Sequence, residues 1–164
     1  MSKYYPAKSA VQSSKALVDA MIDCLYRRKV TLQMSEEEKT KLKAECRDIV
    51  NASVEMCKVP QHLIGYHGDE RNEVADVIFR RNFVNAHLSG GASNDVGFRR
   101  LDDGNFESIV SQYDSGRWWN AASQRYWQAA QASEAVDSAW LNGAIEVETV
   151  DQDDVIKIHC VMPN

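Results

Sequence analysis

The chain has 164 residues, of which 44% are hydrophobic and 26% are charged, as in a soluble globular protein that buries a core. Its apolar runs fall well short of the ~20 residues that cross a bilayer, and residues 1–8 lack the apolar segment of a signal peptide. We therefore expect a cytoplasmic protein with no membrane contact. No basic stripe interleaved with aromatic residues is present, which argues against a nucleic-acid partner.

The charge is distributed unevenly along the chain. Residues 1–60 hold 11 Lys and Arg against 8 Asp and Glu, a net charge of +3. Residues 61–164 hold 8 against 16, a net charge of −8. A bipolar chain of this kind can associate with copies of itself or with a partner of opposite charge. The alternative is that both segments are ordinary solvated surfaces, and the sequence leaves both interpretations open.

The cysteines and histidines do not form a recognisable site. The cysteines are far apart and include no C-x-x-C motif, so reduced, buried thiols are the simplest interpretation; a disulfide or a metal site is the alternative. The histidines lack the spacing of tetrahedral ligands, so we expect no metal site. No local signature marks a catalytic nucleophile. The residues concerned are Cys24, Cys46, Cys57, Cys160, His62, His67, His87 and His159.

Two helices are predicted in the first 60 residues. Apolar residues recur at helical spacing over about 8–29, and cations in the last turn suit the negative end of the helix dipole. Ser35 and Glu38 form a capping box at the start of a second helix, which Pro60 ends. Because only about five residues connect the two helices, we expect them to form an antiparallel hairpin.

After the second helix the pattern becomes mixed. Residues 62–67 are apolar and favour a strand, and a helix is predicted over 70–81 after a short turn. A short strand is predicted over 96–101 and a short helical segment over 106–113. The Gly-Gly segment at 89–95 is predicted to be a connecting loop, since it lacks the Lys-Ser/Thr pair of a phosphate-binding loop.

Residues 117–141 predict one long helix, or two abutting ones, that an Asn-Gly pair ends. Aromatic side chains are concentrated on it at helical spacing. Such a stripe is typical of core packing; where it is exposed, its Trp side chains would instead anchor a protein partner. The candidate interaction residues are Trp118, Trp119 and Trp127.

The last segment has the pattern of a β-hairpin. Residues 144–150 alternate strictly, a turn is predicted at 151–154, and residues 155–161 form the returning strand. These elements together predict an α+β fold that is mainly α, with an N-terminal antiparallel helical hairpin, further helices and a small antiparallel sheet that includes the C-terminal hairpin. Residues 1–60 are predicted to be a helical extension of the mixed portion at 61–164, the two forming one compact unit.

One segment carries a family resemblance. It begins with Tyr66-His-Gly and ends with Asn82-Phe83, and it resembles the first motif of ADP-ribosyltransferase-like proteins, in which a His-Gly pair ends a strand before a helix. In this sequence Asn82 stands where that family usually has Gly. The resemblance implies that His67 contacts the ribose at the nicotinamide end of NAD and that Gly68 allows a close backbone approach.

Two later segments would complete such a site. The segment from Gly116 to Trp119, leading to Tyr126, resembles the second motif of that family, and it implies that Tyr126 helps to bind NAD. Glu146 or Glu148 would supply the acidic residue of the third motif. A carboxylate near the 2′-hydroxyl would stabilise an oxocarbenium-like transition state while aromatic rings stack on the nicotinamide.

The sequence therefore leaves two functions open. The leading hypothesis is a non-enzymatic protein without a cofactor that acts by protein–protein contact or self-association, as a subunit of an assembly or as an accessory or inhibitor protein. The alternative is an NAD-using, ADP-ribosyltransferase-like enzyme. The alternative requires His67, an aromatic side chain and Glu146 or Glu148 to converge on one cleft.

Overall fold

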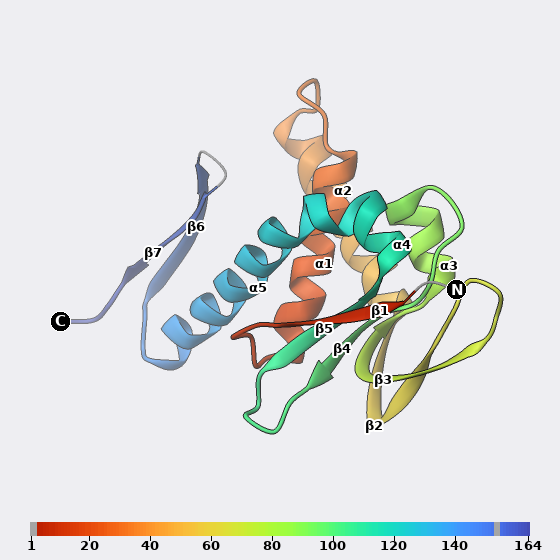
Figure 1. Ribbon diagram of the computed structural model, residues 1–164. Helices are drawn as coiled ribbons and strands as arrows, with labels where there is room; N and C mark the ends of the chain where they lie inside the picture. The colour runs from red at the N-terminus through yellow and green to blue at the C-terminus, as the bar shows by residue number, and fades with distance from the viewer. Residues whose placement is uncertain (1–2, 153–154) are drawn as a thin grey trace.

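A five-stranded antiparallel sheet is the centre of the fold (Figure 1). The computed structural model describes residues 3–152 and 155–164. Within these ranges, each pair of neighbouring strands in the sheet is antiparallel. In order across the sheet the strands are β1 (Tyr4–Lys8), β5 (Phe106–Ser111), β4 (Val96–Arg100), β3 (Glu70–Phe79) and β2 (Val54–Ile64).

The helices contribute to one core on one face of this sheet. Side-chain caps fix where the first two begin: Ser13 Oγ accepts a hydrogen bond from the Ala16 N–H, and Ser35 Oγ accepts one from the Glu38 N–H. No helix in the described ranges is long and apolar enough to cross a membrane. The helical segments are α1 (Ser14–Lys29), α2 (Glu36–Ser53), α3 (Arg81–Val84) with the π-helical turn η1 (Asn85–Ser89), α4 (Gln112–Asp114) with the π-helical turn η2 (Ser115–Trp119), and α5 (Asn120–Leu141).

The main hydrophobic core lies between the sheet, α1 and α5. Leu17, Met21 and Leu25 follow one another at intervals of four on α1, and all three are fully buried. From the sheet, Phe98 stacks on Tyr126 of α5 with ring centroids 5.4 Å apart. The core therefore joins a helix near the start of the chain to a helix near its end.

A smaller apolar cluster lies on the other face of the sheet. The register of β2 and β3 shifts where β2 contains Pro60, and beyond this irregularity Leu63 and Ala75 pack over Gly97 of β4. A Cβ atom at Gly97 would lie 2.7 Å from the Cβ of Ala75 and 2.8 Å from a Cδ of Leu63. These distances are too short for any side chain, so the packing of this face requires glycine at position 97.

Replacing Gly97 with alanine is expected to lower the free energy of unfolding by about 1–3 kcal/mol, because the added methyl group overpacks the contact with Leu63 and Ala75. Gly116→Ala is the matched control, since a Cβ at Gly116 meets no atom within 4 Å. Urea denaturation of both variants tests the prediction. Equal midpoints for the two variants would contradict the close approach at Gly97.

The prediction of a mainly α fold with an N-terminal helical hairpin is wrong. About 46% of the described residues are helical and 32% lie in strands, so the fold is mixed. The chain enters the sheet through β1, which pairs with β5, and α1 packs along α5 in the middle of the molecule. Helical spacing identifies the helices, but it does not reveal that α1 has partners beyond the adjacent α2. The predicted boundary at residues 60/61 also falls inside β2.

Two predicted helical segments are strands. The segment at 70–81 is β3 up to Phe79, and the segment at 106–113 is β5 up to Ser111. β5 is buried on both faces along its whole length and β3 from Val77 to Phe79, so neither strand shows the regular alternation of a half-buried strand. In β3, Val74, Val77 and Ile78 thereby take on a spacing typical of a helix. The second helix also ends earlier than predicted, at Ser53, before β2 begins.

The structure confirms the short strand at 96–101 as β4 and the C-terminal hairpin as β6 (Glu146–Gln152) and β7 (Val155–Val161). The hairpin keeps one register from the pair Glu146–Val161 to the pair Gln152–Val155. It lies beside α5 and forms no part of the larger sheet (Figure 1). Of the predicted turn at 151–154, residues 151 and 152 belong to β6, and residues 153–154 lie outside the described ranges.

Candidate functional site

A cavity opens where the turn between β2 and β3 meets the loop before β4 and the start of α4. Its volume is ≈ 520 Å³, which is in the range of small-molecule sites. It combines exposed aromatic rings with amide groups and one guanidinium. The residues that line it are Tyr66, His67, Asp69, Arg71, Ala92, Asn94, Gln112 and Tyr113.

His67 lies at the rim of this cavity because the β2–β3 turn projects it there. Gly68 has a φ of 82°, in the left-handed region that glycine favours, and its N–H donates to the carbonyl of Gly65 (2.9 Å). The rings of Tyr66 and His67 lie 4.8 Å apart, and both residues are exposed. The turn thus presents two aromatic rings to solvent beside the cavity.

Arg71 fixes the acidic residue of the turn. Its Nη1 donates to Asp69 Oδ2 (3.1 Å), and this hydrogen bond holds the pKa of Asp69 below its usual range. Arg71 also lies over the ring of Tyr4, with its Cζ 5.5 Å from the ring centroid. The Arg71 guanidinium is therefore already engaged with the protein itself.

A buried carboxylate holds the two walls of the cavity together. Asp95 is fully buried and accepts hydrogen bonds from the Ile64 N–H (2.6 Å), the Arg81 N–H (2.7 Å) and Arg80 Nη1 (2.7 Å). It thereby ties the end of β2 and the start of α3 to the loop before β4. Arg80 also pairs with Glu55 on β2.

A second buried carboxylate anchors α4 beneath the same loop. Asp114 is fully buried and accepts hydrogen bonds from Ser111 Oγ (2.7 Å) and Trp118 Nε1 (3.1 Å). Asn94 bridges the two sides: its Oδ1 accepts from the Tyr66 N–H (2.9 Å), and its Nδ2 donates to Ser111 Oγ (3.1 Å). Asn94 and Asp114 therefore form a hydrogen-bonded polar base for the cavity.

Asn94, Asp95 and Asp114 are the residues that the sequence analysis misses. Asn94 and Asp95 belong to the Gly-Gly segment predicted to be a plain loop, and Asp114 follows a segment predicted to be helical. The available signal is the cluster Ser93-Asn-Asp95 just before an apolar strand, because short polar side chains of this kind often satisfy backbone groups in turns. That signal does not identify which distant backbone groups they bind.

The residues of the NAD hypothesis are placed on separate parts of the fold. Tyr126 is buried in the main core, where its Oη donates to the carbonyl of Leu17 (2.7 Å), and burial raises its pKa well above the usual range. Glu146 and Glu148 lie exposed on β6, opposite Val161 and His159 of β7. Only His67 of this set lines the cavity described above, and Gly68 is adjacent to it in the turn.

Two of the three tryptophans predicted to bind a partner are buried in the core. Trp118 and Trp119 are buried, with their rings 5.6 Å apart. Trp127 is partly buried and packs edge-on against Phe98, with centroids 5.8 Å apart. A partner cannot reach Trp118 or Trp119 in this structure. The exposed tryptophan is Trp140, at the other end of α5.

The comparisons identify no relative. No protein-family model, curated protein or solved structure matches this chain. Among the residues that the structure describes, no group of three His, Cys, Asp or Glu side chains could hold a metal ion. The function is therefore argued from the surface of the molecule itself.

A group of exposed apolar residues lies at the C-terminal end of the fold. Trp140 and Leu141 end α5, Ile145 precedes β6, and the Ile145 N–H donates to the carbonyl of Val161 (2.8 Å). This hydrogen bond brings the end of β7 next to the end of α5. We name the group the C-terminal surface; it consists of Trp140, Leu141, Ile145, Val161 and Met162.

Proposed function

We propose that this protein is a non-enzymatic subunit of an assembly and that it binds its protein partner, or a second copy of itself, through the C-terminal surface. The observation that carries the proposal is the exposure of Trp140, Leu141 and Ile145, which are 50%, 88% and 61% exposed. Large apolar side chains exposed to this extent are unfavourable in water. Tryptophan is also among the residues that contribute most to the binding energy of protein interfaces.

The hairpin beside this surface supports the proposal. A two-stranded sheet is marginally stable by itself, and β6 and β7 each leave one edge without a strand partner in the described structure. The edge strands of the larger sheet contain proline, Pro6 in β1 and Pro60 in β2, which discourages the addition of another strand. Neither β6 nor β7 contains proline or a register shift. The hairpin is therefore the better site for a contact that includes strand pairing.

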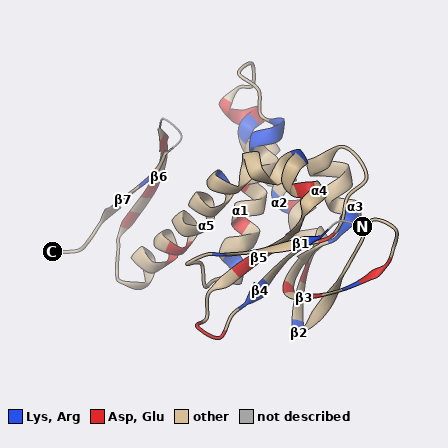
Figure 2. Ribbon diagram, in the orientation of Figure 1, with Lys and Arg blue, Asp and Glu red and all other residues tan. Residues whose placement is uncertain are grey.

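Charge at the margin of the surface fits an interface rim. Glu146 and Glu148 on β6 and Lys157 on β7 are exposed, and Figure 2 shows the acidic residues of β6 beside the uncharged end of α5. Protein interfaces commonly have an apolar centre surrounded by polar groups. The acids of β6 favour a partner segment that carries lysine or arginine.

No comparable observation supports the NAD-using alternative. It needs His67 and one of the two glutamates in one cleft, whereas His67 lies at the β2–β3 turn and both glutamates lie on the C-terminal hairpin, at opposite sides of the molecule in Figure 1. Tyr126 is buried in the core, where it donates a hydrogen bond to the carbonyl of Leu17. We therefore do not propose a transferase activity.

Leu141→Asp is expected to weaken the contact by about tenfold or more, because it puts a charge in place of the most exposed apolar side chain of the C-terminal surface. Light scattering across a range of protein concentrations measures self-association. For a different partner, a photoreactive residue at position 140 is expected to cross-link one protein in the native host, and Leu141→Asp is expected to abolish that product.

Leu32→Asp is the matched control, since Leu32 is 98% exposed in the connection between α1 and α2, away from the hairpin. It is expected to leave both measurements unchanged. A protein that stays monomeric at every concentration and forms no cross-link specific to position 140 would contradict the proposal. So would equal effects of the two aspartate substitutions.

A further inference from the structure

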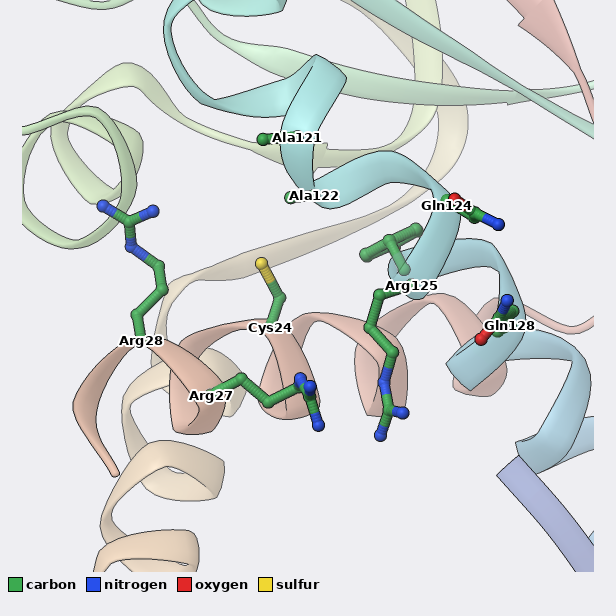
Figure 3. Close-up of a pocket in the computed structure, with 9 residues that line it drawn as sticks. Cys24, Arg27, Arg28, Ala121, Ala122, Gln124, Arg125 and Gln128 are labelled. Carbon is green, nitrogen blue, oxygen red and sulfur yellow. The ribbon is translucent and has the colours of Figure 1, made fainter. Parts of the chain in front are cut away.

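A second cavity lies between α1 and α5, and its charge is one-sided. Its volume is ≈ 380 Å³. Figure 3 shows Arg27 and Arg28 on α1 and Arg125 on α5 around it, with the Cys24 thiol and two alanines between them. Its described lining includes these three guanidinium groups and no carboxylate.

A carboxylate from the C-terminal hairpin already binds to two of these guanidinium groups. Arg125 Nη1 and Nη2 donate to the two oxygens of Asp151 (2.9 and 2.8 Å), which is the paired geometry that suits carboxylate and phosphate groups. Arg27 Nη1 donates to Asp151 Oδ2 (3.0 Å). These hydrogen bonds hold the pKa of Asp151 below its usual range. The arrangement shows that Arg27 and Arg125 can hold one oxyanion between them.

The rest of the lining includes a third guanidinium group and a thiol. Arg28 donates through Nε to the carbonyl of His87 (3.2 Å), which fixes its guanidinium at the opposite side of the cavity from Arg125 (Figure 3). Burial raises the pKa of Cys24 to about 11, so its thiol is neutral at pH 7 and does not repel an anion.

Asp23 supports the site from outside the lining. Its two oxygens accept hydrogen bonds from Arg125 Nε and Nη2 (both 3.1 Å), and this second pair fixes the plane of the guanidinium. Arg125 can therefore keep its orientation when Asp151 leaves. Such preorganisation lowers the cost of binding an anion.

We propose that this cavity is a binding site for a small anion that carries carboxylate or phosphate groups, and that Asp151 occupies its arginine pair when the ligand is absent. The ligand displaces Asp151 from Arg27 and Arg125 and fills the space between them and Arg28. The site does not depend on the proposed contact function, because its groups lie on α1 and α5. Displacement of Asp151 releases β6 from one of its anchors on the body of the protein.

The first test measures binding of inorganic phosphate and of citrate by calorimetry to the wild type, Asp151→Asn and Asp102→Asn. Asp151→Asn removes the competing carboxylate and is expected to bind at least one anion about tenfold more tightly than the wild type, the order of one charged hydrogen bond. Asp102→Asn changes the net charge equally at an exposed turn and is expected to behave as the wild type. Equal affinities for the two variants, or no binding to either, would overturn the proposal.

The second test uses the arginines in the Asp151→Asn background. Arg28→Gln is expected to lower the affinity for the anion several-fold. Arg47 is an exposed arginine on α2, and Arg47→Gln is expected to leave the affinity unchanged. Equal losses of affinity in the two variants would mean that the anion is attracted only by net charge, and would overturn the proposal. Preference for phosphate or for citrate identifies the ligand class.

In the wild type, saturating anion is expected to speed hydrogen exchange of the β6 and β7 amides. Unchanged exchange would overturn the displacement of Asp151.

Discussion

Replacing Asp95 with alanine is expected to lower the free energy of unfolding by about 3–5 kcal/mol, the range for removing one member of a buried, hydrogen-bonded ion pair. Asp95 is fully buried and accepts from Arg80 and from the N–H groups of Ile64 and Arg81. The substitution leaves both N–H groups without their acceptor and removes one of the two carboxylates that pair with Arg80. Urea denaturation monitored by tryptophan fluorescence measures the loss.

Asp102→Ala is the control for removing a carboxylate, since Asp102 is exposed in the turn between β4 and β5; its effect is expected to stay within about 0.5 kcal/mol. Asp95→Asn retains an acceptor for the N–H groups and is expected to lose less stability than Asp95→Ala. If Asp95→Ala were no less stable than Asp102→Ala, the network that joins β2, α3 and the loop before β4 would not be a determinant of stability.

Replacing Phe98 with alanine is expected to cost about 3–5 kcal/mol, as for other large aromatic side chains removed from a core. Phe98 is fully buried, stacks on Tyr126, and lies edge-on to Trp119 and Trp127 at centroid distances of 6.3 and 5.8 Å. The cavity left by the ring lies between the sheet and α5, which are held apart by other side chains. Thermal unfolding and the near-ultraviolet circular dichroism of the tryptophans report the loss.

Tyr5→Ala is the matched control, because Tyr5 is an aromatic residue on β1 that is 50% exposed, and it is expected to cost less than about 1 kcal/mol. Phe98→Leu retains part of the buried volume and is expected to fall between the two. A small effect of Phe98→Ala, with an unchanged dichroism spectrum, would show that α5 collapses onto the sheet and that the aromatic cluster does not depend on this ring.

The sequence predicts the elements whose signals are local. Ser35 and Glu38 locate the start of α2 through a local hydrogen bond. Helical spacing locates α1 and α5 and alternation locates β6, because these two patterns depend on a face exposed to solvent. Elements buried on both faces lose that signal. This is why β3 and β5 are predicted as helical segments, and why the sheet that they complete is missing from the predicted fold.

The candidate sites are predictable only in part, for a related reason. The exposed His67 is conspicuous in the sequence because a His-Gly pair marks a turn. The contacts of Asp95 with Ile64 and of Arg125 with Asp23 and Asp151 span 31, 102 and 26 residues, and no local pattern encodes them. The burial of Trp118 and Trp119 likewise depends on partners elsewhere in the chain, so the stripe alone does not separate core from interface.

The pairing of β1 with β5 has a consequence for how the chain is made. Tyr4 lies opposite Ser111, so the first strand has no partner until more than a hundred further residues have been synthesised. The face of α1 that packs against α5 is covered later still, because α5 ends at Leu141. A nascent chain therefore carries Leu17, Met21 and Leu25 unburied until α5 has been synthesised. Because such non-local contacts are slow to form, we expect the core to form only after α5 has left the ribosome and to benefit from chaperones that hold apolar segments.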